Sequence, residues 1–174
     1  MKPILAAALI GLIAVSLALS QTKNKTIDSL AVLPFLNVGR DRKTEFLADE
    51  ITKRLINRLS KLPNLRVVPY ASILRYKGQE QVDPNLSGKG KAMNPQTVGN
   101  ELGVQAVFYG RVIRRGHSLS VSAELVDVRE NSLIWGNQYN RKLSDFVAVQ
   151  EEMAHDISQK LRTGVNCCSE SKPP

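Results

Sequence analysis

Three β-like runs follow one another with only a few residues between them: residues 106–114, 118–128 and 132–141. In the middle run, apolar and polar residues alternate, which is typical of a strand with one buried and one solvated face. Arg115-Gly116 and Glu130-Asn131 supply the turns, because glycine and asparagine tolerate a positive φ. The pattern predicts an antiparallel meander.

The remaining periodicity predicts strands at 29–36 and 65–71 and helices at 45–62, 95–102 and 145–162. Two helices carry an apolar stripe at helical spacing. The stripe residues are Leu47, Ile51, Leu55, Leu59 and Leu62 in the first, and Phe146, Val149, Met153, Ile157 and Leu161 in the last. Pro63 is expected to stop the first helix, and Ser144 or Asp145 to cap the last.

The resulting order, β-α-β-α-β-β-β-α, predicts an α/β (α+β) sandwich with a mixed sheet of about five strands. One domain is expected over residues 27–162, because there is no internal repeat and no second apolar pattern. Residues 78–94 lack periodicity and predict a solvated loop. Residues 163–174 predict a disordered polar tail.

The chain begins with Lys2 and an apolar run over residues 4–19. As a helix this run spans about 24 Å, which is short of a hydrocarbon core of roughly 30 Å. We therefore expect residues 1–20 to be a signal peptide cleaved between Ser20 and Gln21. Lys23 and Lys25 oppose translocation and favour a membrane anchor as the alternative. The domain is expected to be periplasmic or exported, or otherwise anchored in the inner membrane with the domain outside.

The formal net charge is +8, with 24 Lys and Arg against 16 Asp and Glu. Such a balance permits an acidic protein, an anionic lipid or a nucleic acid as partner, and export disfavours nucleic acid. The two cysteines, Cys167 and Cys168, lie in the tail, so no disulfide is expected within the domain. They form a vicinal disulfide, form an intermolecular bridge, or have no role.

Catalytic and metal-binding motifs are absent from the sequence. His117 and His155 lack the spacing of a metal site, and the glycines of residues 87–93 lack that of a phosphate-binding loop. No nucleophile motif occurs either. We therefore predict no catalytic residue, no cofactor and no metal site, and a protein that is not an enzyme.

Two features remain as candidates for an interaction surface. Arg111, Arg114 and Arg115 form a cationic cluster at the end of the first predicted hairpin. Trp135, the only tryptophan, lies in the last predicted strand. It either packs between strand and helix or provides a platform for a ligand.

Four segments form a series along the chain: SLAVLPFLNVGRDRKTEFLADEITKRLINRLSKLPNLRVV, YKG, VGNELGVQAVFYGRVIRRGHSLSVSAELVDV and LIWGNQYNRKLSDFVAVQEEMAHDISQKLR. Together and in this order they resemble the TolB-like amino-terminal domain family. This bacterial domain is found with tetratricopeptide repeats and in serine/threonine kinase or winged-helix regulator proteins. The chain departs from the family by about eleven extra residues around 85–95, and by lacking a kinase, DNA-binding or repeat region.

The resemblance implies a mixed α/β fold, no established catalytic residue, and a role in interaction or sensing. We therefore expect a non-enzymatic regulatory or interaction domain of the bacterial cell envelope, with an envelope protein as partner. A tetratricopeptide-repeat protein or a kinase is one candidate partner. The alternatives are a small-molecule sensor and a residual regulatory module of a receptor-type serine/threonine kinase system.

Overall fold

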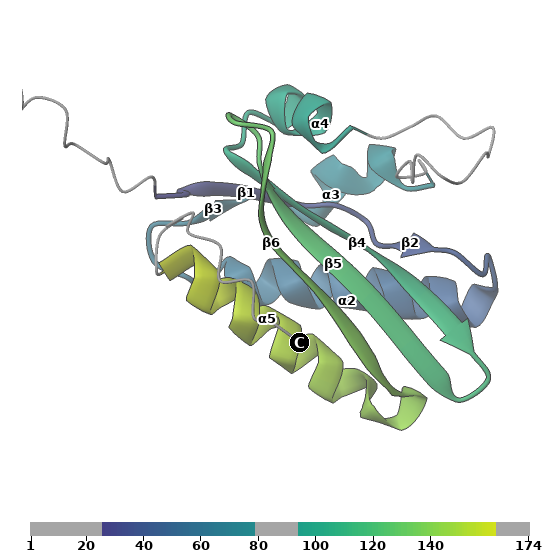
Figure 1. The fold of residues 1–174 in the computed structure, drawn as a ribbon. Coiled ribbons are helices and arrows are strands. Elements are labelled where there is room, and N and C mark those ends of the chain that lie inside the picture. Colours follow the sequence, from purple (N-terminus) through teal and green to yellow (C-terminus); the bar gives the residue numbers. More distant parts are fainter. Residues whose placement is uncertain (1–25, 79–93, 163–174) are drawn as a thin grey trace, which may run out of the picture.

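The computed structural model describes residues 26–78 and 94–162 (Figure 1). The predicted leader with its Ser20–Gln21 cleavage site, most of the predicted loop, and the tail with Cys167 and Cys168 lie outside the described residues. Within the described ranges, no helix has the length and apolar character needed to span a bilayer.

A mixed sheet forms the centre of the molecule, with the strand order β3-β1-β4-β5-β6. Strand β1 (Ser29–Val32) pairs in parallel with β3 (Arg66–Val67) and β4 (Ala106–Arg115). Strands β4, β5 (Ser118–Asp127) and β6 (Ser132–Lys142) form the antiparallel meander. The structure confirms the predicted mixed sheet and α+β class.

The predicted strand at 29–36 is divided in two. β1 ends at Val32, and a short strand β2 (Leu36–Asn37) pairs with β4 farther along. Pro34 has no N–H to give to the ladder, and the N–H of the next residue, Phe35, donates to Thr52 Oγ1 at 3.1 Å. The proline thus redirects the backbone from the sheet toward the helix that follows.

Helix α2 (Arg42–Leu59) is shifted by three residues from the predicted 45–62. It begins early because the Asp41 side chain accepts a hydrogen bond from the Thr44 N–H at 3.0 Å. It ends early because Pro63 cannot donate a helical hydrogen bond and restricts the residue before it. Ile51, Leu55 and Leu59 of the predicted stripe are fully buried.

The region after β3 was predicted wrongly. Only Arg66–Val67 form a strand, and a short helix α3 (Tyr70–Ile73) and a 3-10 turn η1 (Leu74–Tyr76) follow. Pro69 ends the extended segment, and Ile73 and Tyr76 then share one buried helical face. Helix α4 (Pro95–Leu102) has the predicted bounds, and it ends at Gly103, whose φ is +61°.

The last helix, α5 (Phe146–Arg162), does not begin at an isolated cap. Ser144 and Asp145 lie in a 3-10 turn η2 (Leu143–Asp145) that leads directly into it, and Ser144 Oγ donates to Asp145 Oδ1 at 2.9 Å. The predicted Val149, Met153 and Ile157 are fully buried, while Phe146 and Leu161 are partly exposed.

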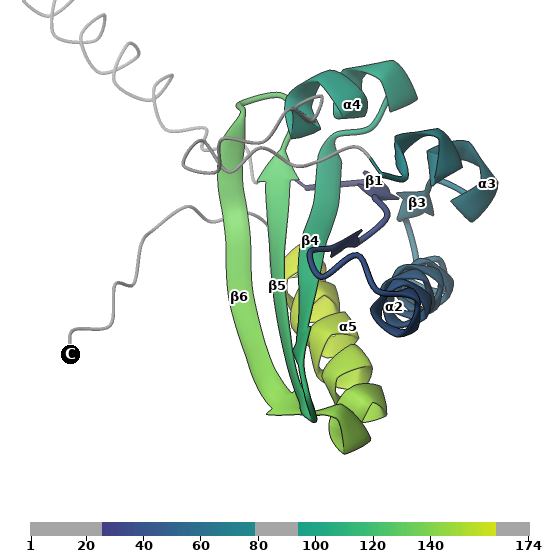
Figure 2. The ribbon, with the colours of Figure 1, turned by 90° about the vertical axis from the view of Figure 1, so that its right-hand side faces the viewer.

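The two faces of the sheet are covered unequally. Helices α2 and α5 lie on one face and bury the larger core, and we call this the helix face (Figure 1). Helices α3 and α4 lie on the opposite, outer face and bury a smaller core against β1 and the start of β4 (Figure 2). The far half of the β4–β6 meander extends beyond α3 and α4. Its helix face is covered there, while its outer face carries half-exposed and exposed side chains.

Candidate functional site

The three arginines of the predicted cationic cluster are divided between the two faces of the sheet. Successive strand residues point to opposite faces. Arg114 lies on the helix face, where its Nη1 is 3.7 Å from Asp41 Oδ1. Arg111 and Arg115 lie on the outer face, opposite Ser122 and Ser118 of β5. The structure therefore does not bring these three residues into a single patch.

Trp135 lies against the helix-face core. Its ring centroid is 6.1 Å from that of Phe108, at an interplanar angle of 33°. Tyr139 lies four residues after Trp135, on the same face of β6, and is 2% exposed. Its hydroxyl donates a hydrogen bond to Asp156 Oδ2 on α5 at 2.7 Å. Burial raises the pKa of Tyr139, and the bond to Asp156 adds to this. This part of β6 packs the strand against the last helix.

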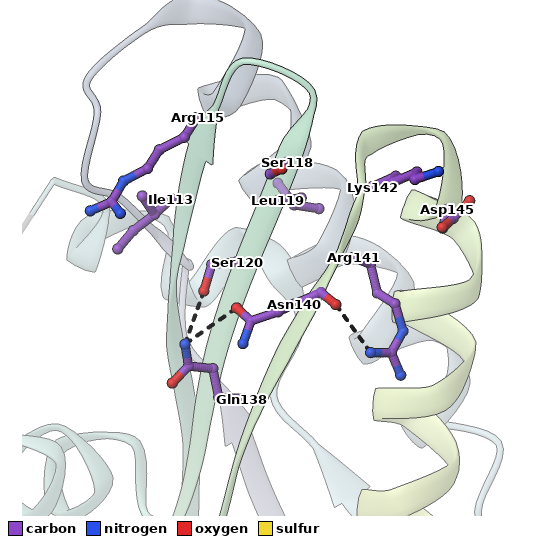
Figure 3. A pocket seen from close by; sticks show the side chains of 10 residues that line it. All are labelled: Ile113, Arg115, Ser118, Leu119, Ser120, Gln138, Asn140, Arg141, Lys142 and Asp145. Carbon is purple, nitrogen blue, oxygen red and sulfur yellow. Dashed lines mark hydrogen bonds between the residues drawn. The ribbon is translucent and has the colours of Figure 1, made fainter.

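The outer face of the meander carries a hollow of about 650 Å³ near the β4–β5 turn (Figure 3). Arg115 and Lys142 lie on its margins, and hydroxyl and amide side chains line its floor. The Gln138 side chain bridges two of these, donating to Ser120 Oγ at 3.2 Å and to Asn140 Oδ1 at 3.3 Å. Ser120, Gln138 and Asn140 are therefore already joined by hydrogen bonds, and Asp145 is the single carboxylate of the lining.

The free edge of β6 is partly closed by its own side chains. Among the described residues β6 pairs on one side only, with β5. The Gln138 N–H donates to Asn137 Oδ1 at 2.8 Å, and the Asn140 carbonyl accepts from Arg141 Nη1 at 3.1 Å. Side chains that bind the outward backbone groups protect an edge from pairing with another strand.

A second hollow of about 520 Å³ lies between the first turns of α2 and α5. Its apolar lining comes from both helices and from η2, and its charged lining is entirely cationic. The lining residues are Phe46, Leu47, Leu143 and Phe146, with Arg42, Lys43 and Arg114. We call this feature the helix-end groove.

Two apolar side chains at or next to the helix-end groove are strongly exposed. Phe46 is 64% exposed, and Val147, next to Phe146 on α5, is 52% exposed. Adjoining exposed apolar side chains with a charged rim are typical of a binding surface. Sequence reasoning missed Phe46 because it lies beside the buried stripe of α2. Its position off that stripe could have indicated an exposed apolar side chain and so a binding surface.

Arg114 faces one carboxylate near the groove. The pKa of Asp41 lies below its ordinary value, chiefly because of its hydrogen bond to Thr44 at the start of α2, with a smaller contribution from Arg114. Asp41 and Arg114 are both partly exposed, so their ion pair contributes little stability. Asp41 itself does not line the groove.

His117 and His155 are both exposed. Within residues 26–78 and 94–162, no three His, Cys, Asp or Glu side chains are grouped so that they could hold a metal ion.

Comparison with known proteins gives one relative by sequence and several by structure. No family model matches the chain. A protein from Rhizobium meliloti (strain 1021), named putative adenylate cyclase 3, is 33% identical over 144 residues, which are 83% of this chain and 22% of that protein. The chain thus spans about a fifth of the length of the curated relative that it matches.

Two solved structures are similar to the whole domain. TolB from Acinetobacter baumannii has a TM-score of 0.52 at 14% identity, over 80% of this chain and 29% of that one. Lipoprotein GNA1162 from Neisseria meningitidis has a TM-score of 0.50 at 22% identity, over 75% of this chain and 99% of that one. The chain has a TolB-like fold. At these identities the likeness concerns the fold alone, and it agrees with the resemblance seen in the sequence.

Proposed function

We propose that this chain is a non-enzymatic protein-interaction domain of the bacterial cell envelope, exported or anchored there by residues 1–20. The helix-end groove carries the proposal, because Phe46 in its lining and Val147 next to its lining residue Phe146 are exposed to water where α2 and α5 begin. A folded domain gains nothing in stability from exposing such side chains, and a partner that covers them gains apolar contact area.

The leader and the TolB-like fold support the envelope as the place of action. A chain with this leader reaches the envelope either as a mature domain or through the anchor. The similar structures are a TolB and a lipoprotein. A sensor for a small molecule beside Trp135 has less support, because Trp135 packs against Phe108 and is not among the residues that line the outer hollow.

A second candidate is a regulatory module that serves a signalling enzyme. One observation favours it: the curated relative is named a putative adenylate cyclase, and this chain matches 22% of its length. The two candidates share the groove as binding surface and differ in the identity of the partner.

Photochemical cross-linking tests the proposal. The full chain, with p-benzoylphenylalanine in place of Phe46, is produced in the organism that encodes it and irradiated. We expect a covalent adduct with one defined protein, and its identification by mass spectrometry separates an envelope protein from a signalling enzyme.

The matched control carries the same photoreactive residue in place of Leu74. Leu74 is 44% exposed and lies in η1, on the other side of the sheet. The same adducts from both positions, or none from Phe46, would contradict the groove as a binding surface. Turnover of any substrate that a single substitution abolishes would contradict the non-enzymatic role.

A further inference from the structure

The charge around the helix-end groove defines the chemistry of its partner. Arg42, Lys43 and Arg114 line it, and no carboxylate is among its lining residues. The first turn of α5 adds the positive end of a helix dipole, whereas the first turn of α2 is already capped by the Asp41 carboxylate. A partner must therefore bring negative charge close to an apolar contact.

From this we infer that the groove binds an acidic amphipathic helix of another protein, and the inference rests on the proposed interaction function. The apolar side chains of that helix pack between Phe46 and Phe146. Its carboxylates lie beside Arg42 and Lys43.

The shape of the groove favours a helix over an extended strand. Six of its seven lining residues belong to α2, η2 and α5, and Arg114 of β4 is the single lining residue from a strand, so a partner meets mainly helical side chains. An amphipathic helix places its apolar anchors on one face at a spacing of three or four residues, and it needs only side-chain contacts.

A second copy of this chain fits the groove poorly. A symmetric dimer presents the same patch on both subunits, so the cationic rim of one copy would face that of the other. The formal net charge of +8 adds to this repulsion.

An anionic membrane surface satisfies the charge but not the shape. Membrane contact through a helix uses apolar side chains that protrude into the lipid. Phe46 does protrude, but Leu47, Leu143 and Phe146 are only partly exposed and line the hollow beside it, which can receive a side chain from a partner.

The test uses the photoreactive residue at Phe46 and reads the sequence of the attached segment. We expect the cross-linked peptide to carry apolar residues at helical spacing with Asp and Glu beside them. A neutral or basic segment overturns the inference and leaves the proposed function intact. An adduct with a second copy of this chain, or with lipid, overturns it as well. If Phe46 forms no adduct, both proposals fall.

Charge reversal provides the quantitative measurement. Lys43→Glu places a carboxylate in the first turn of α2, where the helix dipole favours it, so the fold is retained. We expect this variant to lower the adduct yield by about tenfold, and added salt to lower the wild-type yield. The control is Arg115→Glu on the outer face, which should leave the yield unchanged. Equal yields from Lys43→Glu and the wild type overturn the inference.

Discussion

The two faces of the β4–β6 meander are built from the same strands and have opposite properties. On the helix face, Phe108, Val121 and Tyr139 are buried beneath α2 and α5. On the outer face, Ser120 and Gln138 hydrogen-bond to each other beside open solvent. Two neighbouring residues of one strand therefore differ strongly in burial, whereas residues of different strands on the same face are alike. The effect of a substitution on stability thus depends on the face to which the side chain points.

The largest difference is expected from a buried charge. Val121→Asp places an unpaired carboxylate in the helix-face core, where the wild-type residue is fully buried, and should cost about 3 kcal/mol or more in free energy of unfolding. Ser120→Asp, one residue earlier and on the outer face, should cost about 0.5 kcal/mol or less. Urea denaturation of both variants measures this. Equal losses would show that the outer face is as tightly packed as the helix face.

A pair of glycines gives a smaller contrast. A Cβ at Gly110, on the helix face, would lie 2.3 Å from Phe35 Cε1 and 2.5 Å from the Ser122 carbonyl oxygen. The backbone oxygen cannot move aside, so Gly110→Ala should destabilise the domain by about 1–3 kcal/mol.

Gly136, on the outer face of β6, serves as the control. Its Cβ would meet nothing closer than 3.7 Å, so Gly136→Ala should be neutral or slightly stabilising in the same denaturation measurement. A Gly110→Ala variant with wild-type stability would mean that β4 and β5 shift easily, which would weaken the contrast between the faces.

The smallest effect on stability is expected from two tyrosines, one on each face, whose hydroxyl groups have similar surroundings. Tyr139 on the helix face donates to Asp156, and Tyr109 on the outer face donates to Glu124. Burial, followed by the bond to the carboxylate, raises the pKa of each hydroxyl above the ordinary value of about 10.

The direction of the resulting pH dependence follows from linkage. Above about pH 10 the unfolded chain loses the tyrosine protons while the folded chain keeps them. The unfolded state then binds fewer protons, so the free energy of unfolding falls as pH rises from there toward the raised folded pKa. Below pH 10 this contribution is fully present. Thermal unfolding of wild type and the Tyr109→Phe/Tyr139→Phe variant between pH 8 and 11 should show a shallower decline in the variant. Parallel declines would show that neither hydroxyl is held in its protonated form.

Patterning alone predicted the elements that are long and periodic. The stripe of Ile51 and Leu55 and the alternation around Val121 place apolar side chains on one side of a helix or strand, whatever the rest of the chain does. For the same reason the buried face of the meander could be predicted.

Local chemistry that competes with patterning was predicted less well. Pro34 splits the first strand, and Pro69 ends the second so that Ile73 and Tyr76 turn into a helical segment. Helix α2 starts earlier than its apolar stripe indicates, because the Asp41 carboxylate accepts a hydrogen bond from the Thr44 N–H and caps the helix there. Each case depends on one or two hydrogen bonds, which a hydrophobic pattern does not record.

The sequence by itself determined the mixed α+β class, the buried stripes of α2 and α5, and the basic character of the chain, because these depend on periodicity and composition. Only the tertiary structure decided the candidate site. Phe46 and Phe146 are a hundred residues apart, and they meet because α2 and α5 begin at the same end of the sheet. Arg114 joins them while Arg115 does not, because the pleat of a strand sends successive side chains to opposite faces.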